Sequence, residues 1–426
     1  MNELVVLKQN PELAAAKLNK KNVLNAQNAV QEVLIIDEHR KKILTELEQK
    51  RAQLNTVSKE IGILMASGQK EQAEKAKEET KILKDQIAQF EINIRQIEQE
   101  LHDKVILLPN LPHDSVPFGS HAEDNTVVFQ QEISLKLPNN PLPHWELATK
   151  LNLIDWEAGN KITGSGFPVY IGQGAKLQRA LINFFLHEAE LAGYTEIQPP
   201  ILVNADTGYG TGQLPDKEGQ MYFTPADNLY LIPTAEVPIT NLYRDVIVEE
   251  KKMPIKNCGY TPCFRREAGS YGKDVRGLNR LHQFDKVEIV QIAHPERSYE
   301  ALEEMVAYVK TLVEKLGLPY RILLLCGGDM SFASAKTYDF EVFSGAQERW
   351  LEVSSVSNFE TFQTNRMKLR FRNSETQKTQ LAHTLNGSAL ALPRIVAALL
   401  ENNQQADGTI RIPECLQPYM KQTHLS

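Results

Sequence analysis

Charged and aromatic side chains recur along two strand-like segments in the second half of the chain. Arg265 and Glu267 stand two residues apart in the first segment, and Phe284, Lys286 and Glu288 have the same spacing in the second. Side chains alternate between the faces of a strand, so each set is expected to share one sheet face. Arginine suits phosphate because its planar fork donates two parallel hydrogen bonds. The pattern therefore predicts a phosphate-binding face, and a salt-bridged face open to water is the alternative.

Other kinds of catalytic site lack their sequence motifs. The chain has no GxxxxGK[ST] loop, no GxGxxG after a strand, no HExxH and no GxSxG. Its ten histidines are scattered, and its four cysteines lack the C-x-x-C spacing of a zinc site. The sequence therefore indicates neither a protein nucleophile nor a structural metal centre.

The segments that carry these residues are predicted to belong to an α+β domain built on an antiparallel sheet. Two strands joined by a polar, glycine-bearing loop predict a hairpin around Arg265 and Glu288. Strand-like and helical runs alternate through the rest of the region from 145 to 426. These runs include Leu229–Ile232, Lys286–Ile292 and Arg321–Cys326 as strands, and Leu177–Ala192 and Ser298–Leu316 as helices.

A long helical hairpin is predicted to precede this domain, at about 28–104. The stretch has no proline and only two glycines, and apolar residues recur at steps of three and four, as in a coiled-coil seam. Gly68 offers a turn, so the two helices should run antiparallel. The pattern alone fits either a dimerisation coiled coil or an intramolecular arm that reaches a large partner. The seam positions are Ile43, Leu47, Lys50, Leu54, Val57, Ile61 and Leu64, then Ala73, Ala76, Thr80, Leu83, Ile87, Phe90, Ile94, Ile97 and Leu101.

Length and charge narrow the class of protein. The 426 residues allow two or three domains, and the net charge of −7 argues against a protein that coats DNA. No apolar run reaches the ~18 residues of a membrane span, and the N-terminus lacks a signal-peptide layout. Four cysteines in so long a chain do not form a disulfide framework. We therefore expect a cytoplasmic protein that binds neither membrane nor DNA, while a nucleic-acid partner held by a local basic stripe stays open.

The amino-acid sequence of the hairpin resembles motif 2 of class II aminoacyl-tRNA synthetases, in the form that this motif has in the bacterial-type seryl-tRNA synthetase family. The resemblance covers essentially the whole chain, and Gly193–Pro200 resembles motif 1, which leads to a proline at the family's dimer interface. It implies a class II antiparallel sheet with flanking helices, preceded by a two-helix coiled-coil arm. The implied domains are a tRNA-binding domain at 1–108, a linker at 109–144 and a catalytic domain at 145–426. The other similar segments are Thr211–Pro215, Thr234–Pro238, Gly328–Lys336, Glu352–Ser355 and Asn386–Arg394.

The resemblance also implies residues for ATP and Mg²⁺. Arg265 contacts the α-phosphate, and Arg394 of motif 3 reaches the γ-phosphate; these two are the implied catalytic residues. Phe284 stacks beneath the adenine, and Arg394 covers its other face. Glu352 and Ser355 hold the Mg²⁺ ion between phosphate oxygens. The implied ATP set is Arg265, Arg266, Glu267, Leu281, Phe284, Glu352, Val353, Ser354, Ser355 and Arg394.

The activity that the resemblance implies is that of a serine–tRNA ligase. ATP activates L-serine to seryl-adenylate, and the serine then passes to the 3′-OH of tRNA(Ser); tRNA(Sec) is left open as a second substrate. The implied enzyme is a homodimer, and its arm meets the long variable arm of the serine tRNA. The implied serine set is Thr234, Ala235, Glu236, Arg265, Glu288, Asn386 and Ser388.

Three positions carry residues that differ from those usual in the family. Ala389 replaces the second glycine of motif 3, Pro393 stands where glycine often precedes the arginine, and Gly166 stands where arginine is common. A methyl group at Ala389 restricts the backbone near the ligand. Two rival functions fit parts of the chain: a relative that loads serine onto a carrier protein, and a non-catalytic RNA-binding paralogue. The first lacks an arm, and the second has no need of the charged residues that this chain retains.

Overall fold

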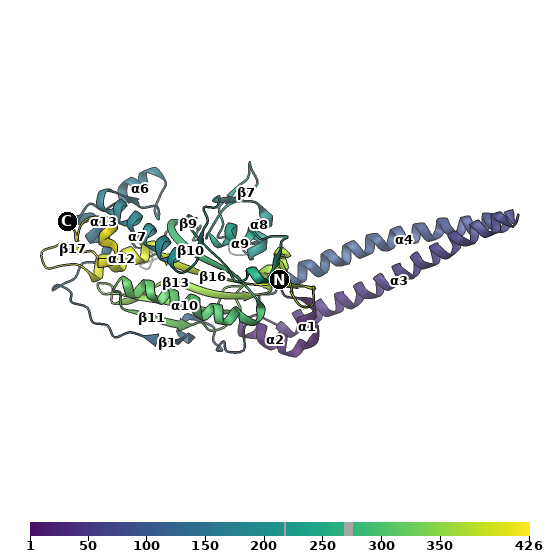
Figure 1. Ribbon diagram of the computed structural model, residues 1–426, viewed down its shortest axis with the longest axis horizontal. Coiled ribbons are helices and arrows are strands. Elements are labelled where there is room, and N and C mark those ends of the chain that lie inside the picture. The colour runs from purple at the N-terminus through teal and green to yellow at the C-terminus, as the bar shows by residue number, and fades with distance from the viewer. Residues whose placement is uncertain (217–218, 268–275) are drawn as a thin grey trace. The chain divides into compact units, whose positions relative to one another are not determined.

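A computed structural model describes residues 1–216, 219–267 and 276–426 (Figure 1). The described chain divides into two compact units. The first is formed by residues 2–19 and 23–109, and the second by residue 1, residues 20–22 and residues 110–426. Most of the loop predicted inside the motif 2 hairpin, at 268–275, lies outside the described residues.

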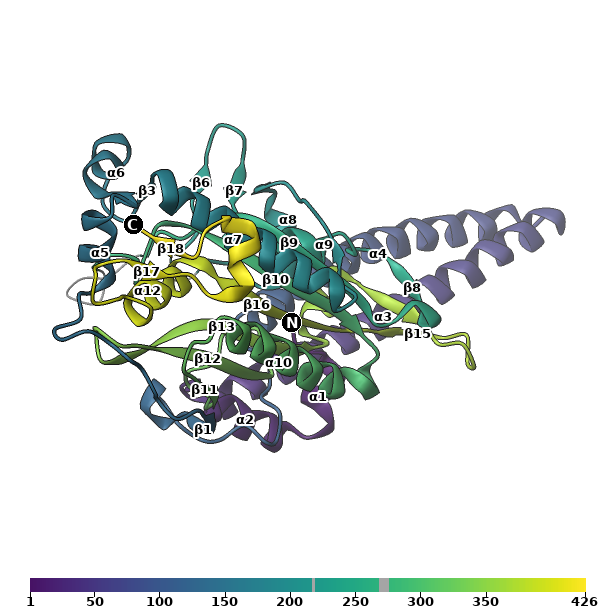
Figure 2. The ribbon, with the colours of Figure 1, turned by 60° about the vertical axis from the view of Figure 1, so that its left-hand side comes forward.

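The unit from 2 to 109 is helical. Two short helices, α1 (Leu4–Gln9) and α2 (Pro11–Lys20), precede the long helices α3 (Ala26–Ala66) and α4 (Lys70–Val105), which lie side by side (Figures 1 and 2). Gly68 has a positive φ of 78° at the turn between them. The predicted two-helix arm is therefore confirmed, and its seam is filled within one chain.

Burial along the arm follows the predicted seam. Leu47 and Val57 of α3 and Leu83 and Ile97 of α4 are buried, whereas most of the charged residues around them are exposed. Lys50, the polar seam position, is half-buried. Ion pairs also join the two helices, from Arg51 to Glu91 (2.9 Å) and from Lys104 to Glu32 (2.8 Å). Such exposed pairs contribute little, so the apolar seam is the main stabilising contact.

An eight-stranded sheet forms the centre of the other unit. Its strands run in the order β1-β11-β12-β13-β16-β10-β9-β4, and neighbours are antiparallel except for β4 and β9. The predicted α+β class with an antiparallel sheet is confirmed. The stretch 109–144, predicted as a linker with one strand at Asn125–Gln130, contains β1 at that place, and β1 pairs with β11 at the edge of this sheet. The bounds are β1 (Thr126–Gln130), β4 (Thr195–Glu196), β9 (Ile255–Phe264), β10 (Gln283–Ala293), β11 (Tyr320–Leu324), β12 (Lys336–Ser344), β13 (Arg349–Glu360) and β16 (His383–Ala391).

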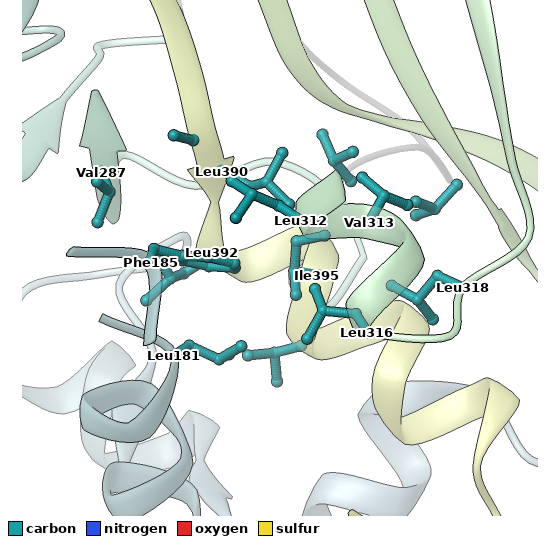
Figure 3. Packing of buried hydrophobic residues seen from close by; sticks show 14 of the residues in the cluster. Leu181, Phe185, Val287, Leu312, Val313, Leu316, Leu318, Leu390, Leu392 and Ile395 are labelled. Atoms are coloured by element: carbon teal, nitrogen blue, oxygen red, sulfur yellow. The ribbon is translucent and has the colours of Figure 1, made fainter. Parts of the chain in front are cut away.

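Three helices cover one face of this sheet. They are α7 (Gly172–Leu191), α10 (Ser298–Lys315) and α12 (Leu392–Asn402), and their apolar side chains meet in one core (Figures 2 and 3). Phe185, Leu312 and Ile395, one from each helix, are fully buried there (Figure 3). Val287 and Ile289 of β10 join the same core. The alternate residues of that strand are therefore directed to the opposite face of the sheet.

Short elements complete the fold around the sheet. The helices are α5 (His144–Lys150), α6 (Trp156–Ile162), α8 (Ala205–Thr211), α9 (Glu236–Asn241), α11 (Phe362–Met367) and α13 (Gln417–Met420). The strands are β2 (Ile154–Asp155), β3 (Val169–Tyr170), β5 (Leu202–Val203), β6 (Phe223–Thr224), β7 (Leu229–Leu231), β8 (Ile247–Glu249), β14 (Arg370–Arg372), β15 (Thr379–Leu381), β17 (Ile410–Arg411) and β18 (His424–Leu425). Among the described residues no helix is both long enough and apolar enough to span a membrane.

The prediction that Arg265 and Glu267 share a face of one strand is wrong, because β9 ends at Phe264. The Arg265 amide donates to the carbonyl of His282 (2.9 Å), and Glu267 has a positive φ of 47°. The chain has left the extended conformation at Glu267, so period-two alternation does not apply there. Phe284, Lys286 and Glu288 do lie on one strand, β10.

Candidate active site

A cavity of about 700 Å³ lies where the hairpin strands, β12, β13 and β16 meet the start of α12. It brings together most of the residues singled out in the sequence. Two are not in its lining: Ala235 is fully buried just before α9, and the Arg266 amide donates to the carbonyl of Gln220. The predicted residues that line it are Thr234, Glu236, Arg265, Glu267, Leu281, Phe284, Glu288, Glu352, Val353, Ser354, Ser355, Asn386, Ser388 and Arg394.

One end of the cavity is built around a buried carboxylate. Glu288 of β10 is fully buried, and its Oε2 lies 2.5 Å from Nζ of Lys286 and 3.4 Å from the hydroxyl of Ser388, its cross-strand partner. Its other oxygen, Oε1, is buried without a hydrogen-bond partner among the described residues. A buried carboxylate oxygen without a partner costs stability. Glu288 is therefore set to accept a hydrogen bond from a ligand.

A second carboxylate lies at the same end. Glu236, at the start of α9, accepts hydrogen bonds from the amides of Gln363 (2.6 Å) and Asn386 (2.7 Å). Burial, followed by the negative charge of Glu288, raises the pKa of Glu236 to about 7, and the two amide donors oppose that rise. A cationic ligand would favour the ionised form of Glu236. This end of the cavity therefore suits a small molecule that carries an ammonium group.

The lining of the cavity also includes the arginine and the aromatic ring of the hairpin. The guanidinium carbon of Arg265 lies 5.3 Å from the centre of the Phe284 ring. Glu267 is held by an ion pair with Arg280 at 3.0 Å. An aromatic face beside a guanidinium group matches a purine ring joined to a phosphate.

The part of the lining that comes from β13 combines carboxylate and hydroxyl oxygens. Glu352 and Ser355 are three residues apart on β13 and would face opposite ways on a regular strand. The register shifts between Phe340 and Glu341, leaving Val353 as an extra residue, so both Glu352 and Ser355 line the cavity.

Arg394, near the start of α12, contacts Glu352 at the edge of the cavity. Its Nη1 donates to the carbonyl of Glu352 (2.8 Å) and lies 3.7 Å from the carboxylate of that residue. Its Nε donates to the carbonyl of Asn279 (3.1 Å). The guanidinium is thereby fixed between the hairpin and β13.

Three cavity or neighbouring residues were not assigned a role from the sequence. Lys286 had a usable signal, because it stands two residues before Glu288 on the same strand. Gln363 had none, since its contact with Glu236 spans 127 residues of the chain. Asp339 lines the cavity opposite Ser355 only because of the pairing between β12 and β13. Burial and the charge of Glu352 raise the pKa of Asp339 well above its usual value.

The two units match two family descriptions. Residues 222–403 match the tRNA synthetase class II core domain (G, H, P, S and T), and residues 1–112 match the seryl-tRNA synthetase N-terminal domain. The antiparallel sheet is thus that of a class II aminoacyl-tRNA synthetase core.

Full-length relatives narrow the class further. The chain is 50% identical over 419 residues to the serine–tRNA ligase of Salinibacter ruber, with 98% of each chain covered. It is 45% identical over 422 residues to that of Carboxydothermus hydrogenoformans, covering 99% of this chain and 98% of the relative. The chain belongs to the seryl-tRNA synthetase family.

A solved structure agrees with this assignment. The fold superposes on the seryl-tRNA synthetase of Pyrococcus horikoshii, complexed with ATP, with a TM-score of 0.95 and 31% sequence identity. The match covers 100% of this chain and 99% of that one. The predicted fold and the predicted enzyme class, an ATP-dependent serine–tRNA ligase, are therefore confirmed.

Proposed function

We propose that the cavity on the sheet activates L-serine with ATP and passes the serine to the 3′-OH of tRNA(Ser). The observation that carries this proposal is that three kinds of group line one cavity. They are the neighbouring carboxylates Glu236 and Glu288, the stacked pair of Arg265 and Phe284, and Arg394. The cavity thus offers a site for an ammonium group, a site for the reacting phosphate and a site for the rest of the nucleotide.

In the first step a serine carboxylate oxygen attacks the α-phosphorus of ATP, and pyrophosphate leaves. Two anions approach each other, and negative charge spreads over the phosphoryl oxygens. Arg265 at the α-phosphate and Arg394 toward the γ-phosphate oppose that repulsion. Catalysis then depends on positioning and electrostatic stabilisation, and no protein nucleophile is required.

Serine selection follows from the buried oxygens at the carboxylate end. Glu236 holds the substrate ammonium. The unpaired Oε1 of Glu288 accepts a hydrogen bond from the serine hydroxyl, and the hydroxyl of Thr234 or Ser388 forms a second hydrogen bond with it. Alanine would leave these buried groups without partners, a penalty that rejects such an analogue by about 10⁴-fold. Threonine would be excluded by crowding, which is the weaker of the two filters.

The carboxylate and hydroxyl groups that β13 contributes to the cavity fit Mg²⁺. Glu352 and Ser355 supply a carboxylate and a hydroxyl on one face, and Oδ1 of Asp339 is buried nearby without a partner among the described residues. Oxygen ligands, with the remainder supplied by phosphates and water, are the usual coordination of Mg²⁺. When bound there, the ion would neutralise charge on the phosphate oxygens. Glu352 also remains the anchor of Arg394.

The arm supplies the RNA contact in this proposal, with residues 1–108 as the tRNA-binding domain, 109–144 as the linker and 145–426 as the catalytic domain. A rigid coiled coil with exposed lysines suits A-form RNA, which is recognised by shape and by its phosphates and 2′-OH groups. In the second step the terminal ribose hydroxyl attacks the adenylate carbonyl, and AMP leaves.

We further infer a homodimer that works in the cytoplasm. Motif 1 at Gly193–Pro200 supports the dimer, since Leu191 before it and Leu202 after it are exposed apolar residues. All four cysteines are free, as expected in a reducing compartment. Sedimentation velocity at micromolar concentration should give the mass of two chains.

Two assays on two proteins test the proposed function. The full chain and a chain lacking 28–104 are compared in serine-dependent ATP–pyrophosphate exchange and in charging of tRNA(Ser). We expect both proteins to exchange pyrophosphate and only the full chain to charge tRNA efficiently. A full chain without serine-dependent exchange contradicts the proposed activity, and equal charging by both proteins contradicts the role of the arm. A carrier-loading relative would show exchange without tRNA charging, and a non-catalytic paralogue would show neither.

A further inference from the structure

A second cavity, of about 650 Å³, lies beside the active site in the catalytic unit. Leu281 lines both cavities, so the second one adjoins the proposed nucleotide subsite. The activation of serine has no use for this space, because the proposed serine, adenine and phosphate contacts all lie in the first cavity.

The walls of the second cavity are aromatic and cationic. Trp145, Trp156 and Phe167 line it, together with the cations Arg276 and Lys150 and one carboxylate, that of Glu146. The guanidinium carbon of Arg276 lies 4.7 Å from the centre of the Trp145 ring. Stacking surfaces beside cations are typical of sites for single-stranded nucleic acid, whose bases stack while its phosphates meet the cations.

Two hydrogen-bond donors in these walls lack partners. The indole N–H groups of Trp145 and Trp156 are both buried, and within the described ranges neither has an acceptor. A buried indole N–H normally finds an acceptor. A nucleotide carries such acceptors on its base, sugar and phosphate. Both N–H groups are covered by protein atoms, so a ligand would accept from them only after a small movement of the cavity walls.

The wall next to Arg276 is held by buried contacts. The amide of Leu278 donates to Nε2 of His144 (2.8 Å), and Nδ1 of that ring lies 2.7 Å from the carboxylate of Glu401. His144 and Glu401 are both fully buried. The cavity is thus formed by the folded chain before any ligand arrives, which reduces the cost of ordering it on binding.

We propose that this cavity binds a nucleotide of the single-stranded 3′ end of the tRNA while the terminal ribose reaches the adenylate. The proposal rests on the proposed function, because only the second step brings a polynucleotide to this place. The ligand class is an unpaired nucleotide, with its base against Trp156 or the Arg276–Trp145 stack and its phosphate near Arg276 or Lys150.

Binding measurements on two forms of the substrate test this site. One form is intact tRNA(Ser), and the other lacks its unpaired 3′ nucleotides. The variants are Arg276→Gln, Trp156→Leu and the conservative Trp156→Phe. Arg276 is exposed, so its replacement leaves the fold intact, and Arg297→Gln, an exposed arginine outside the cavity, is the matched control.

We expect Arg276→Gln and Trp156→Leu to weaken binding of intact tRNA by about five- to hundredfold, the range for lost base stacking. Both should bind the trimmed tRNA as the wild type does, and Trp156→Phe should retain most of the affinity. Arg276→Gln should also lower the salt slope of binding by about 0.7, the value for one phosphate contact on a single strand.

Exchange of pyrophosphate separates this inference from the function on which it rests. The variants should exchange within about twofold of the wild type, since the first step does not use the cavity. Unchanged binding of intact tRNA, or equal weakening for intact and trimmed tRNA, would overturn the proposal. A loss of exchange in the variants would also overturn it, because the residues would then belong to the adenylate site. A wild-type chain without exchange would contradict the proposed function instead.

Discussion

The arm and the catalytic sheet achieve stability and function by opposite means. Along α3 and α4 the buried residues are mostly apolar and repeat every three or four positions, while most charges are exposed. The buried Asp37 of α3 is paired with Lys8 and Arg40 of the same unit. On the cavity face of the sheet the buried residues include charged ones: Lys286, Glu288 and Glu236. The arm is therefore a structure that stabilises itself, whereas the cavity contains groups whose best partners are ligands.

Substitutions in the two regions should therefore affect folding stability and catalytic activity differently. Burying unpaired charge costs stability, so such groups persist in an active site because substrate binding and catalysis use them. A change in the cavity should alter chemistry with little loss of fold, and a change in the arm seam should do the reverse. The following predictions test that separation, in order of expected effect.

Replacing Arg265 by alanine should have the largest effect. It removes the cation at the α-phosphate, and losses of one such stabilising group reduce rates by about 10²–10³-fold. Serine-dependent ATP–pyrophosphate exchange measures the loss, and circular dichroism should show an unchanged fold. Arg297→Gln, at an exposed arginine, is the control, and exchange near the wild-type rate in Arg265→Ala would contradict the assignment.

Replacing Glu352 by glutamine should have the next effect. It removes one carboxylate from the oxygen set proposed for Mg²⁺ and weakens the anchor of Arg394. Loss of a coordinating or supporting group lowers metal affinity by about 10–100-fold. The Mg²⁺ concentration that half-saturates exchange should rise by that factor, and excess Mg²⁺ should restore part of the rate. An unchanged Mg²⁺ dependence would exclude Glu352 from the metal site.

Replacing Gln363 by methionine should shift the pH dependence of serine use. Glu236 must be ionised to hold the substrate ammonium, and its pKa is about 7, so kcat/KM for serine should fall as the pH falls below that value. Gln363 donates to Glu236 and lowers this pKa, so its removal should move the acidic limb to higher pH. We expect about a tenfold rise in KM near neutral pH, the lower end of what a hydrogen bond to a charged group is worth. A profile that keeps its midpoint would contradict this positioning role.

Replacing Leu83 by alanine should have the smallest effect on the chemistry. Leu83 is buried in the arm seam, and large-to-small changes at buried leucines cost about 2–5 kcal/mol. We expect the arm to unfold at a lower temperature and tRNA charging to weaken, while pyrophosphate exchange stays at the wild-type rate. Leu181→Ala, in the core of the catalytic unit (Figure 3), is the matched comparison and should destabilise the unit that carries exchange. A parallel loss of exchange in Leu83→Ala would remove the separation.

The same contrast explains what the sequence could predict. The seam of α3 and α4 is periodic, so its residues and the turn at Gly68 follow from spacing alone. Glu288 and Phe284 could be placed together because they lie on one strand. Glu352 and Ser355 could not, since a bulge at Val353 brings them to one face.

Contacts between distant segments were also beyond the sequence. Gln363 reaches Glu236 and Asp339 faces Ser355 only through the fold and the sheet register. Period-two alternation failed at Glu267 because the strand had already ended. The roles of individual residues follow from the family resemblance, because spacing alone fits a water-exposed sheet face as well as a phosphate-binding one.

A crystal structure with ATP, Mg²⁺ and a non-reactive serine analogue would show directly where the reactants bind. We expect the α-phosphate within hydrogen-bonding distance of the Arg265 guanidinium, the adenine against Phe284 and the amino group of the analogue beside Glu236. Nucleotide bound away from Arg265, or an amino acid bound away from Glu236 and Glu288, would contradict it.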